Sequence, residues 1–164
     1  MKLLGLNRIE LLVRDPDQAE ADLSSLLGGL EFEKEPVIDD RRPLDCRIDW
    51  KAGIEIVHPP DPTHAVGRLL EEEGEHVFTV VFEVESIDDA RQWVTSQGFG
   101  VMYEYDNGRE GQPATIRQIT IDRDRTHGLL VTLIERIPRE SRQPASQEGA
   151  GRVASLFRSS RETQ

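Results

Sequence analysis

Two stretches of the chain repeat the same order of apolar and polar positions. The first runs from Arg8 to Ala19 and the second from Thr79 to Ala90, each residue of one lying 71 positions from its counterpart in the other. Each begins with a run rich in β-branched, aliphatic or aromatic residues, continues with an acidic or serine cap, and ends in a pattern with helical spacing. A repeated strand, cap and helix within one small chain predicts a duplicated structural module.

The first half of the chain has a pattern that predicts the order β-α-β-β-β. Asp15 is followed by Pro16, which is typical of a helix N-cap and its first residue, and Gly28 is suited to ending that helix. Alternation of apolar and polar positions predicts the strands. We expect these strands over residues 8–14, 30–37, 44–50 and 54–57.

The second half repeats this order after a proline-rich turn and a short linking helix over residues 63–73. Ser86 is the predicted cap of a helix that runs to about Gln97 and turns Ile87, Ala90, Trp93 and Val94 inward. After Pro138 the composition shifts to Ser, Arg, Gln, Glu and Gly, which predicts a disordered tail. We expect the strands over residues 76–84, 101–105, 115–121 and 128–135.

Composition and charge exclude several classes of partner. The 164 residues carry a formal net charge of −11, which argues against binding to nucleic acid or to an anionic membrane. The single cysteine, Cys46, excludes an intramolecular disulfide, and no apolar run approaches the ~20 residues of a membrane span. These features predict a cytoplasmic protein with neither a membrane nor a nucleic-acid partner.

The predicted order of elements resembles the vicinal oxygen chelate superfamily, which includes glyoxalase I, the bleomycin-resistance proteins and methylmalonyl-CoA epimerase. The match to the epimerase branch is carried by residues 53–59, 82–90 and 127–133, within a resemblance that covers about residues 5–136. It implies an α+β fold of two tandem βαβββ modules that form half-barrels around a glyoxalase-like cleft, and a homodimer. We expect one domain over residues 1–137, with module one at 5–60, a linker helix at 61–74 and module two at 75–137, followed by the tail at 138–164.

The resemblance also implies where a divalent metal would bind, and this sequence departs from that pattern. The family's two histidine positions fall on Arg8 and Thr79, and its two carboxylate or amide positions fall on Glu55 and Thr132. Only Glu55 suits such a metal, because a guanidinium is always protonated and a threonine hydroxyl is a weak ligand. We therefore expect no metal and no other cofactor.

Arg8 and Glu55 are then the leading candidates for chemistry at the centre of the predicted cleft. Arg8 would stabilise negative charge on a ligand, and Glu55 or Asp45 would act as the general base. Strand alternation places further side chains around them, and we expect Asp45 and Arg47 to lie opposite Glu55 in the central hairpin. The predicted binding residues are Glu10, Thr79, Glu83, Thr132, Tyr103 and Arg117.

Three functions fit these residues. The first is a metal-independent glyoxalase-fold protein that acts on or binds a small organic carboxylate or acyl molecule, as an isomerase, epimerase or lyase if it is an enzyme. The second is a non-catalytic small-molecule-binding protein of the resistance type. The third is a metal-dependent epimerase-like enzyme with displaced ligands, for which His76 is the nearest histidine to Thr79. A slip of three residues turns a strand side chain to the opposite face, so this third function needs a β-bulge.

Overall fold

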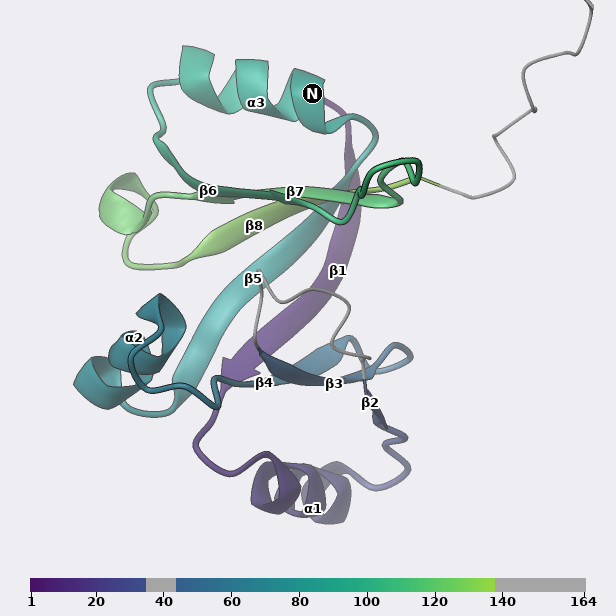
Figure 1. Cartoon of the computed structure of the whole chain (residues 1–164), viewed down its shortest axis with the longest axis vertical. Helices are drawn as coiled ribbons and strands as arrows, with labels where there is room; N and C mark the ends of the chain where they lie inside the picture. Colours follow the sequence, from purple (N-terminus) through teal and green to yellow (C-terminus); the bar gives the residue numbers. More distant parts are fainter. Residues whose placement is uncertain (35–43, 138–164) are drawn as a thin grey trace, which may run out of the picture.

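The computed structural model describes residues 1–34 and 44–137, and it contains the two predicted modules in tandem (Figure 1). Module one consists of β1 (Leu3–Leu12), α1 (Pro16–Leu27), β2 (Glu33–Lys34), β3 (Asp45–Asp49) and β4 (Ile54–His58). Helix α2 (Ala65–Glu73) links it to module two. Module two consists of β5 (His76–Val84), α3 (Ile87–Ser96), β6 (Val101–Asp106), β7 (Ile116–Ile121), the short 3-10 helix η1 (Arg123–Arg125) and β8 (Val131–Arg136). The predicted order is confirmed, whereas the predicted tail and residues 35–37 of the second strand lie outside the described residues.

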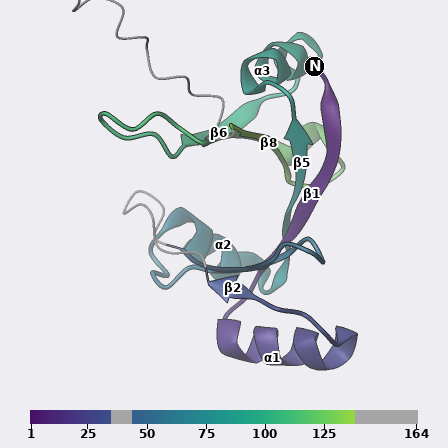
Figure 2. The same ribbon diagram turned by 90° about the vertical axis from the view of Figure 1, so that its right-hand side faces the viewer.

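All eight strands belong to one curved sheet, in the order β2-β3-β4-β1-β5-β8-β7-β6. The first strands of the two modules, β1 and β5, pair antiparallel at its centre, and each lies parallel to the last strand of its own module. Figures 1 and 2 show α1 and α3 on the outer sides of the two ends of this sheet. We call the face turned away from these two helices the inner face.

Strand register confirms the duplication residue by residue. Arg8 lies opposite Val81 and Glu10 lies opposite Thr79, so a shift of 71 positions exchanges the two pairs. Glu10 also neighbours Glu55 on β4, and its counterpart Val81 neighbours Thr132 on β8. Arg8 and Thr79 are therefore equivalent positions of the two modules, as are Glu55 and Thr132.

Local capping explains where the helices begin. The Asp15 carboxylate accepts hydrogen bonds from the backbone N–H groups of Asp17 and Gln18 at 3.1 and 3.0 Å, and Pro16 follows as the first residue of α1. The Ser86 hydroxyl accepts from the N–H of Asp89 at 3.2 Å at the start of α3. Both predicted helix starts are therefore confirmed.

The two outer helices pack against the sheet to different degrees. Helix α3 covers a core on the outer face of module two, formed by Val84, Ile87, Ala90, Val94, Ile119, Ile121 and Leu133. Trp93, which we expected to point inward, lies at the edge of this contact and is 50% exposed. Helix α1 has no buried side chain, and Leu26 near its end is 77% exposed. The apolar spacing of α1 thus predicted the helix correctly but not how deeply it packs.

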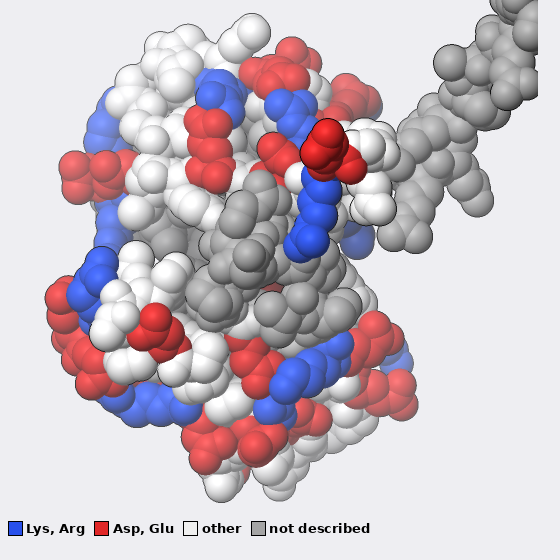
Figure 3. Space-filling model, in the orientation of Figure 1, with Lys and Arg blue, Asp and Glu red and all other residues white. Residues whose placement is uncertain are grey.

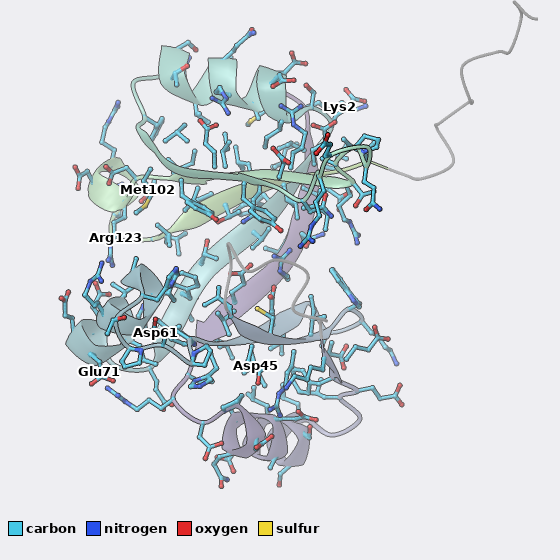
Figure 4. All side chains as sticks on the ribbon, in the orientation of Figure 1. Lys2, Asp45, Asp61, Glu71, Met102 and Arg123 are labelled. Atoms are coloured by element: carbon cyan, nitrogen blue, oxygen red, sulfur yellow. The ribbon has the colours of Figure 1, made fainter. Side chains whose placement is uncertain are left out.

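Helix α2 joins the two modules at the inner face. Its Leu70 packs in a second core cluster with Leu12, Leu44, Cys46 and Val57. Ion pairs tie the same helix to both modules, from Arg14 to Glu71 and from Arg123 to Glu73. Two of these residues, Glu71 and Arg123, are labelled in Figure 4. The linker helix is therefore part of the core.

None of the described helices has the length and apolarity that spanning a membrane requires.

Candidate functional site

Buried polar side chains cross the inner face of the sheet from one module to the other. Strand register places Glu10 between Glu55 and Thr79, and places Thr132 beside Thr120. Each of these side chains is at most 7% exposed. Buried polar groups in folded proteins are normally hydrogen-bonded, so their partners define what this face can do. The buried polar set of the inner face is Arg8, Glu10, Glu55, Thr79, Gln118, Thr120 and Thr132.

Arg8 lies between two glutamates in the module-one half of this face. Its Nε donates to Glu55 Oε2, its Nη2 donates to Glu10 Oε1 at 2.6 Å, and its Nη1 donates to Asn7 Oδ1 at 2.8 Å. The Asn7 amide in turn donates to Glu83 Oε2 at 3.1 Å. A buried ion pair is tolerated when such additional hydrogen bonds compensate for lost hydration. We call Arg8, Glu10 and Glu55 the ion cluster.

Glu55 differs from its neighbours because one of its oxygens is unsatisfied. Its side chain is 1% exposed, and Oε1 has no hydrogen-bond partner among the described residues. The residue directly across the β3–β4 hairpin is Ile48, which is fully buried and offers only an apolar surface. An unpartnered buried acceptor costs about 1–3 kcal/mol, and more for a charged group. Such an atom is a candidate for ligand contact or proton transfer.

The module-two half of the face contains a linear chain of hydrogen-bonded threonine hydroxyls. Thr79 Oγ1 donates to the Leu130 carbonyl at 3.0 Å and lies 3.1 Å from Thr132 Oγ1, which lies 3.1 Å from Thr120 Oγ1. Each hydroxyl has a single hydrogen, and that of Thr79 is donated to the Leu130 carbonyl. Thr132 must therefore donate to Thr79, and Thr120 must donate to Thr132. The hydroxyl hydrogens are all used within the sheet, so these threonines support the strands and offer a ligand no donor.

The side chains at the family's metal positions do not fit a divalent metal. Arg8 brings a fixed positive charge to the centre, and the hydroxyls of Thr79 and Thr132 are bonded to each other. His76 does not replace a missing ligand, since it lies at the start of β5, three residues from Thr79, and its Nε2 lies 3.7 Å from Glu73 Oε2 on α2. Within residues 1–34 and 44–137, no group of three His, Cys, Asp or Glu side chains has the spacing of a metal site.

Asp45 lies on the opposite side of the sheet from the ion cluster. Its Oδ2 pairs with Lys34 at 3.1 Å and lies 3.7 Å from Arg47, which in turn binds α1 through Asp17. Figure 4 shows Asp45 on the side of its strand that faces α1. The hairpin register explains this placement, because Cys46 and Ile48, and not Asp45 and Arg47 as we expected, lie across from Val57 and Glu55. The strand therefore does not bring Asp45 to Glu55.

Arg117 also lies on the outer face, beside α3. Its guanidinium donates to both carboxylate oxygens of Asp88 at 2.7 and 2.8 Å, and these hydrogen bonds hold the pKa of Asp88 below its usual range. It lines a groove of about 460 Å³ between α3 and the β6–β7 hairpin, together with Ile87, Arg91, Tyr103, Glu104, Tyr105, Asp106, Gln118 and Ile119. The sheet separates Arg117 from the ion cluster, and of the other predicted binding residues only Tyr103 lines the same groove.

The remaining predicted residues share the inner face with the ion cluster. Glu83 connects to Arg8 through Asn7, and Tyr103 lies opposite Thr120 on the edge strand β6, where it is 44% exposed. Sequence reasoning missed Asn7, Gln118 and Thr120. The last two could have been found, because they alternate with apolar Ile119 and Ile121 in a hairpin that leads to Thr132. No sequence pattern marked Asn7, because its position depends on a register shift in β1 between Leu6 and Arg8.

Comparison with known proteins gives structural matches only. No protein-family model matches the sequence, and no curated protein matches it. The methylmalonyl-CoA epimerase of Mycobacterium tuberculosis is 21% identical with a TM-score of 0.66, over 85% of this chain and 92% of that one. A variant of the Streptomyces coelicolor methylmalonyl-CoA epimerase in complex with 2-nitronate-propionyl-CoA is 18% identical with a TM-score of 0.66, over 84% and 100% of the two chains. A hypothetical protein from Bacillus halodurans is 16% identical with a TM-score of 0.67, over 82% and 95%.

These similarities concern the fold. At such identities the backbone is shared while most side chains differ, and a fold of this kind carries many functions. The chain therefore shares the glyoxalase-like fold of these methylmalonyl-CoA epimerases, as the sequence predicted. Its function depends on the side chains of its own inner face.

Proposed function

We propose that the protein binds a small organic molecule at the inner face without a divalent metal, and that the ion cluster forms the centre of the site. The observation that carries this proposal is Glu55, whose Oε2 is held by Arg8 while Oε1 lies buried without a partner among the described residues. A ligand group that contacted Oε1 would remove the cost of the unsatisfied acceptor. Arg8 fixes the orientation of that carboxylate through the hydrogen bond from its Nε to Oε2.

The same atoms support a catalytic version of the site. Structures of methylmalonyl-CoA epimerases share the fold, and one of them contains 2-nitronate-propionyl-CoA, which favours an acyl molecule as the ligand class. In an isomerase, epimerase or lyase, Glu55 would remove a proton next to the ligand's carbonyl, and Arg8 would stabilise the negative charge that develops. Both groups are already in contact, so the general base and the positive charge would act at one place.

Binding without catalysis is the second candidate, and the threonine chain favours it. Inverting a carbon centre with two bases needs a second acid or base on the other side of the ligand. The module-two positions equivalent to Arg8 and Glu55 are Thr79 and Thr132, whose hydroxyls are bonded to each other and do not titrate near neutral pH. A site with one carboxylate is sufficient to hold a ligand. It supplies only one of the two acid–base groups that such an inversion of a carbon centre needs.

A thermal-shift screen with two matched variants tests the proposed site. Acyl-CoAs, keto acids and aromatic metabolites are screened, since a ligand at 100 times its Kd adds about 2.7 kcal/mol to the free energy of unfolding. We expect Glu55→Gln to abolish or strongly reduce the shift caused by a hit. Asp45→Asn makes the same chemical change on the outer face and should leave that shift unchanged.

The pattern across the two variants decides the result. A shift that both variants retain, or that only Asp45→Asn removes, would place binding away from the inner face and contradict the proposal. Turnover of a hit by the wild-type protein, lost in Glu55→Gln, would favour the catalytic version over simple binding.

A further inference from the structure

The unsatisfied oxygen of Glu55 restricts the chemistry of the ligand. An ionised carboxylate has only lone pairs to offer, so a partner for Oε1 must bring a hydrogen. A ligand carboxylate or phosphate would bring further lone pairs and negative charge to an oxygen that is already anionic. The group that reaches Glu55 must therefore be a donor.

The surroundings of Glu55 favour a nitrogen donor over other donors. Glu10 and Glu83 are further carboxylates on the same face. Arg8 already donates to Glu55, Glu10 and Asn7, and the second cation, Arg136, lies 3.5 Å from Glu83. Apolar Ile48 and Val81, both fully buried, flank the cluster and keep the local dielectric low. Any donor to a carboxylate forms a charge-assisted hydrogen bond, but the N–H of a protonated amine also brings a positive charge, whose attraction to the carboxylates is stronger in such surroundings.

We propose that the site takes a small ligand with an amine N–H, which donates to Glu55 Oε1, and that it discriminates against carboxylate and phosphate groups at this position. This inference rests on the proposed function, because it assigns a ligand class to the same inner-face site. It departs from the carboxylate or acyl class that the family resemblance implied, since an ionised carboxylate group has no hydrogen to donate to Oε1.

The surface of the molecule is in keeping with this assignment. Acidic and basic side chains are interspersed over the face shown in Figure 3, and the chain as a whole carries a net charge of −11. A negative net charge raises the local concentration of cations relative to anions near the protein. Long-range electrostatics therefore favour the approach of an amine over that of a polyanionic thioester.

Matched sets of small molecules test the ligand class. Each set shares one body (phenyl, cyclohexyl or hexyl) and differs in its end group, which is an aminomethyl, a methyl ether or a carboxylate. Binding to the full chain is measured by thermal shift and titration calorimetry, with acetyl-CoA as a polyanionic comparison. We expect an amine member to bind and its ether and carboxylate counterparts to bind at least about 10-fold more weakly, since a hydrogen bond to a charged group accounts for that difference.

Two variants separate the contact from the charge. Glu55→Gln keeps an acceptor for Arg8 but turns the free oxygen into an NH₂ donor, so we expect amine binding to weaken by about 10- to 100-fold. Glu10→Gln removes the same charge from the same cluster and leaves Glu55 Oε1 in place, so its effect should be several-fold smaller. Circular dichroism of both variants establishes that the fold is retained.

Each outcome has a distinct meaning. Amine binding that Glu55→Gln weakens far more than Glu10→Gln supports the inference. Equal losses in the two variants overturn the contact with Oε1, because charge alone would then explain the affinity. Carboxylate or thioester binding that depends on Glu55 overturns the ligand class while leaving the proposed function intact. Amine binding that neither variant changes overturns both, and failure of every amine overturns the inference.

Discussion

Replacing Arg8 with methionine should lower the free energy of unfolding by about 3–5 kcal/mol at pH 7. The substitution keeps much of the side-chain volume but removes the cation that donates to Glu55 and Glu10, both of which are at most 3% exposed. Two carboxylates would then lie in the interior without that counter-charge. Denaturant unfolding, with the slope compared between wild type and variant, measures the loss.

A second arginine on the same molecule provides the control. Arg117 also binds a carboxylate with two hydrogen bonds, but its partner Asp88 is 63% exposed. Exposed pairs contribute about 0–1 kcal/mol, so Arg117→Met should change stability little. If Arg8→Met has an effect as small as that of Arg117→Met, the ion cluster is not the buried structural element described here.

Restoring metal-ligand chemistry at three positions should create a divalent metal site. Arg8→His, Thr79→His and Thr132→Glu, made together, would combine with native Glu55 to give two imidazoles and two carboxylates. The register equivalence of Arg8 with Thr79 and of Glu55 with Thr132 predicts that these four side chains converge. We expect the triple variant to bind Zn²⁺, Co²⁺, Ni²⁺ or Mn²⁺, and saturating metal to add about 2.7 kcal/mol to its stability at 100 times the Kd.

The matched control moves one histidine to the other face of the same strand. Val80→His replaces Thr79→His in an otherwise identical triple variant, and alternation along β5 points this side chain away from the other three ligands. Metal affinity should fall by at least about 10-fold in titration calorimetry, the size of effect typical when a metal site loses supporting interactions. Equal affinities, or no binding by the first variant when its fold is intact, would show that the four positions do not converge.

The fold could be predicted because duplication and local signals agree. Strand β5 begins and ends where its β-branched and aromatic run does, at His76 and Val84, and the caps at Asp15 and Ser86 start their helices as expected. Helix depth could not be predicted in the same way. The spacing that turns Leu26 toward one side of α1 says nothing of how closely the sheet approaches, and that residue is 77% exposed.

The site was predictable only in part, because strand alternation fixes relative facing and not register. Arg8 and Glu10 were correctly placed on one face, as any two residues two apart in a strand must be. Asp45 required the register across the β3–β4 hairpin, which the turn geometry sets, and a shift of one residue moved it to the face beside α1. The hydrogen-bond direction in the threonine chain depends on the Leu130 carbonyl, which no side-chain pattern reveals.

The ratio of bound metal to purified wild-type protein tests the central claim most directly, namely that the ion cluster takes the place of a divalent metal. The protein is equilibrated in turn with Mn, Co, Ni, Fe and Zn, desalted, and analysed by mass spectrometry of the elements. The ion cluster predicts a ratio far below one metal ion per chain in every case, because the Arg8 guanidinium lies against Glu55 at the shared centre. One metal ion per chain, lost in Glu55→Gln, would contradict the account.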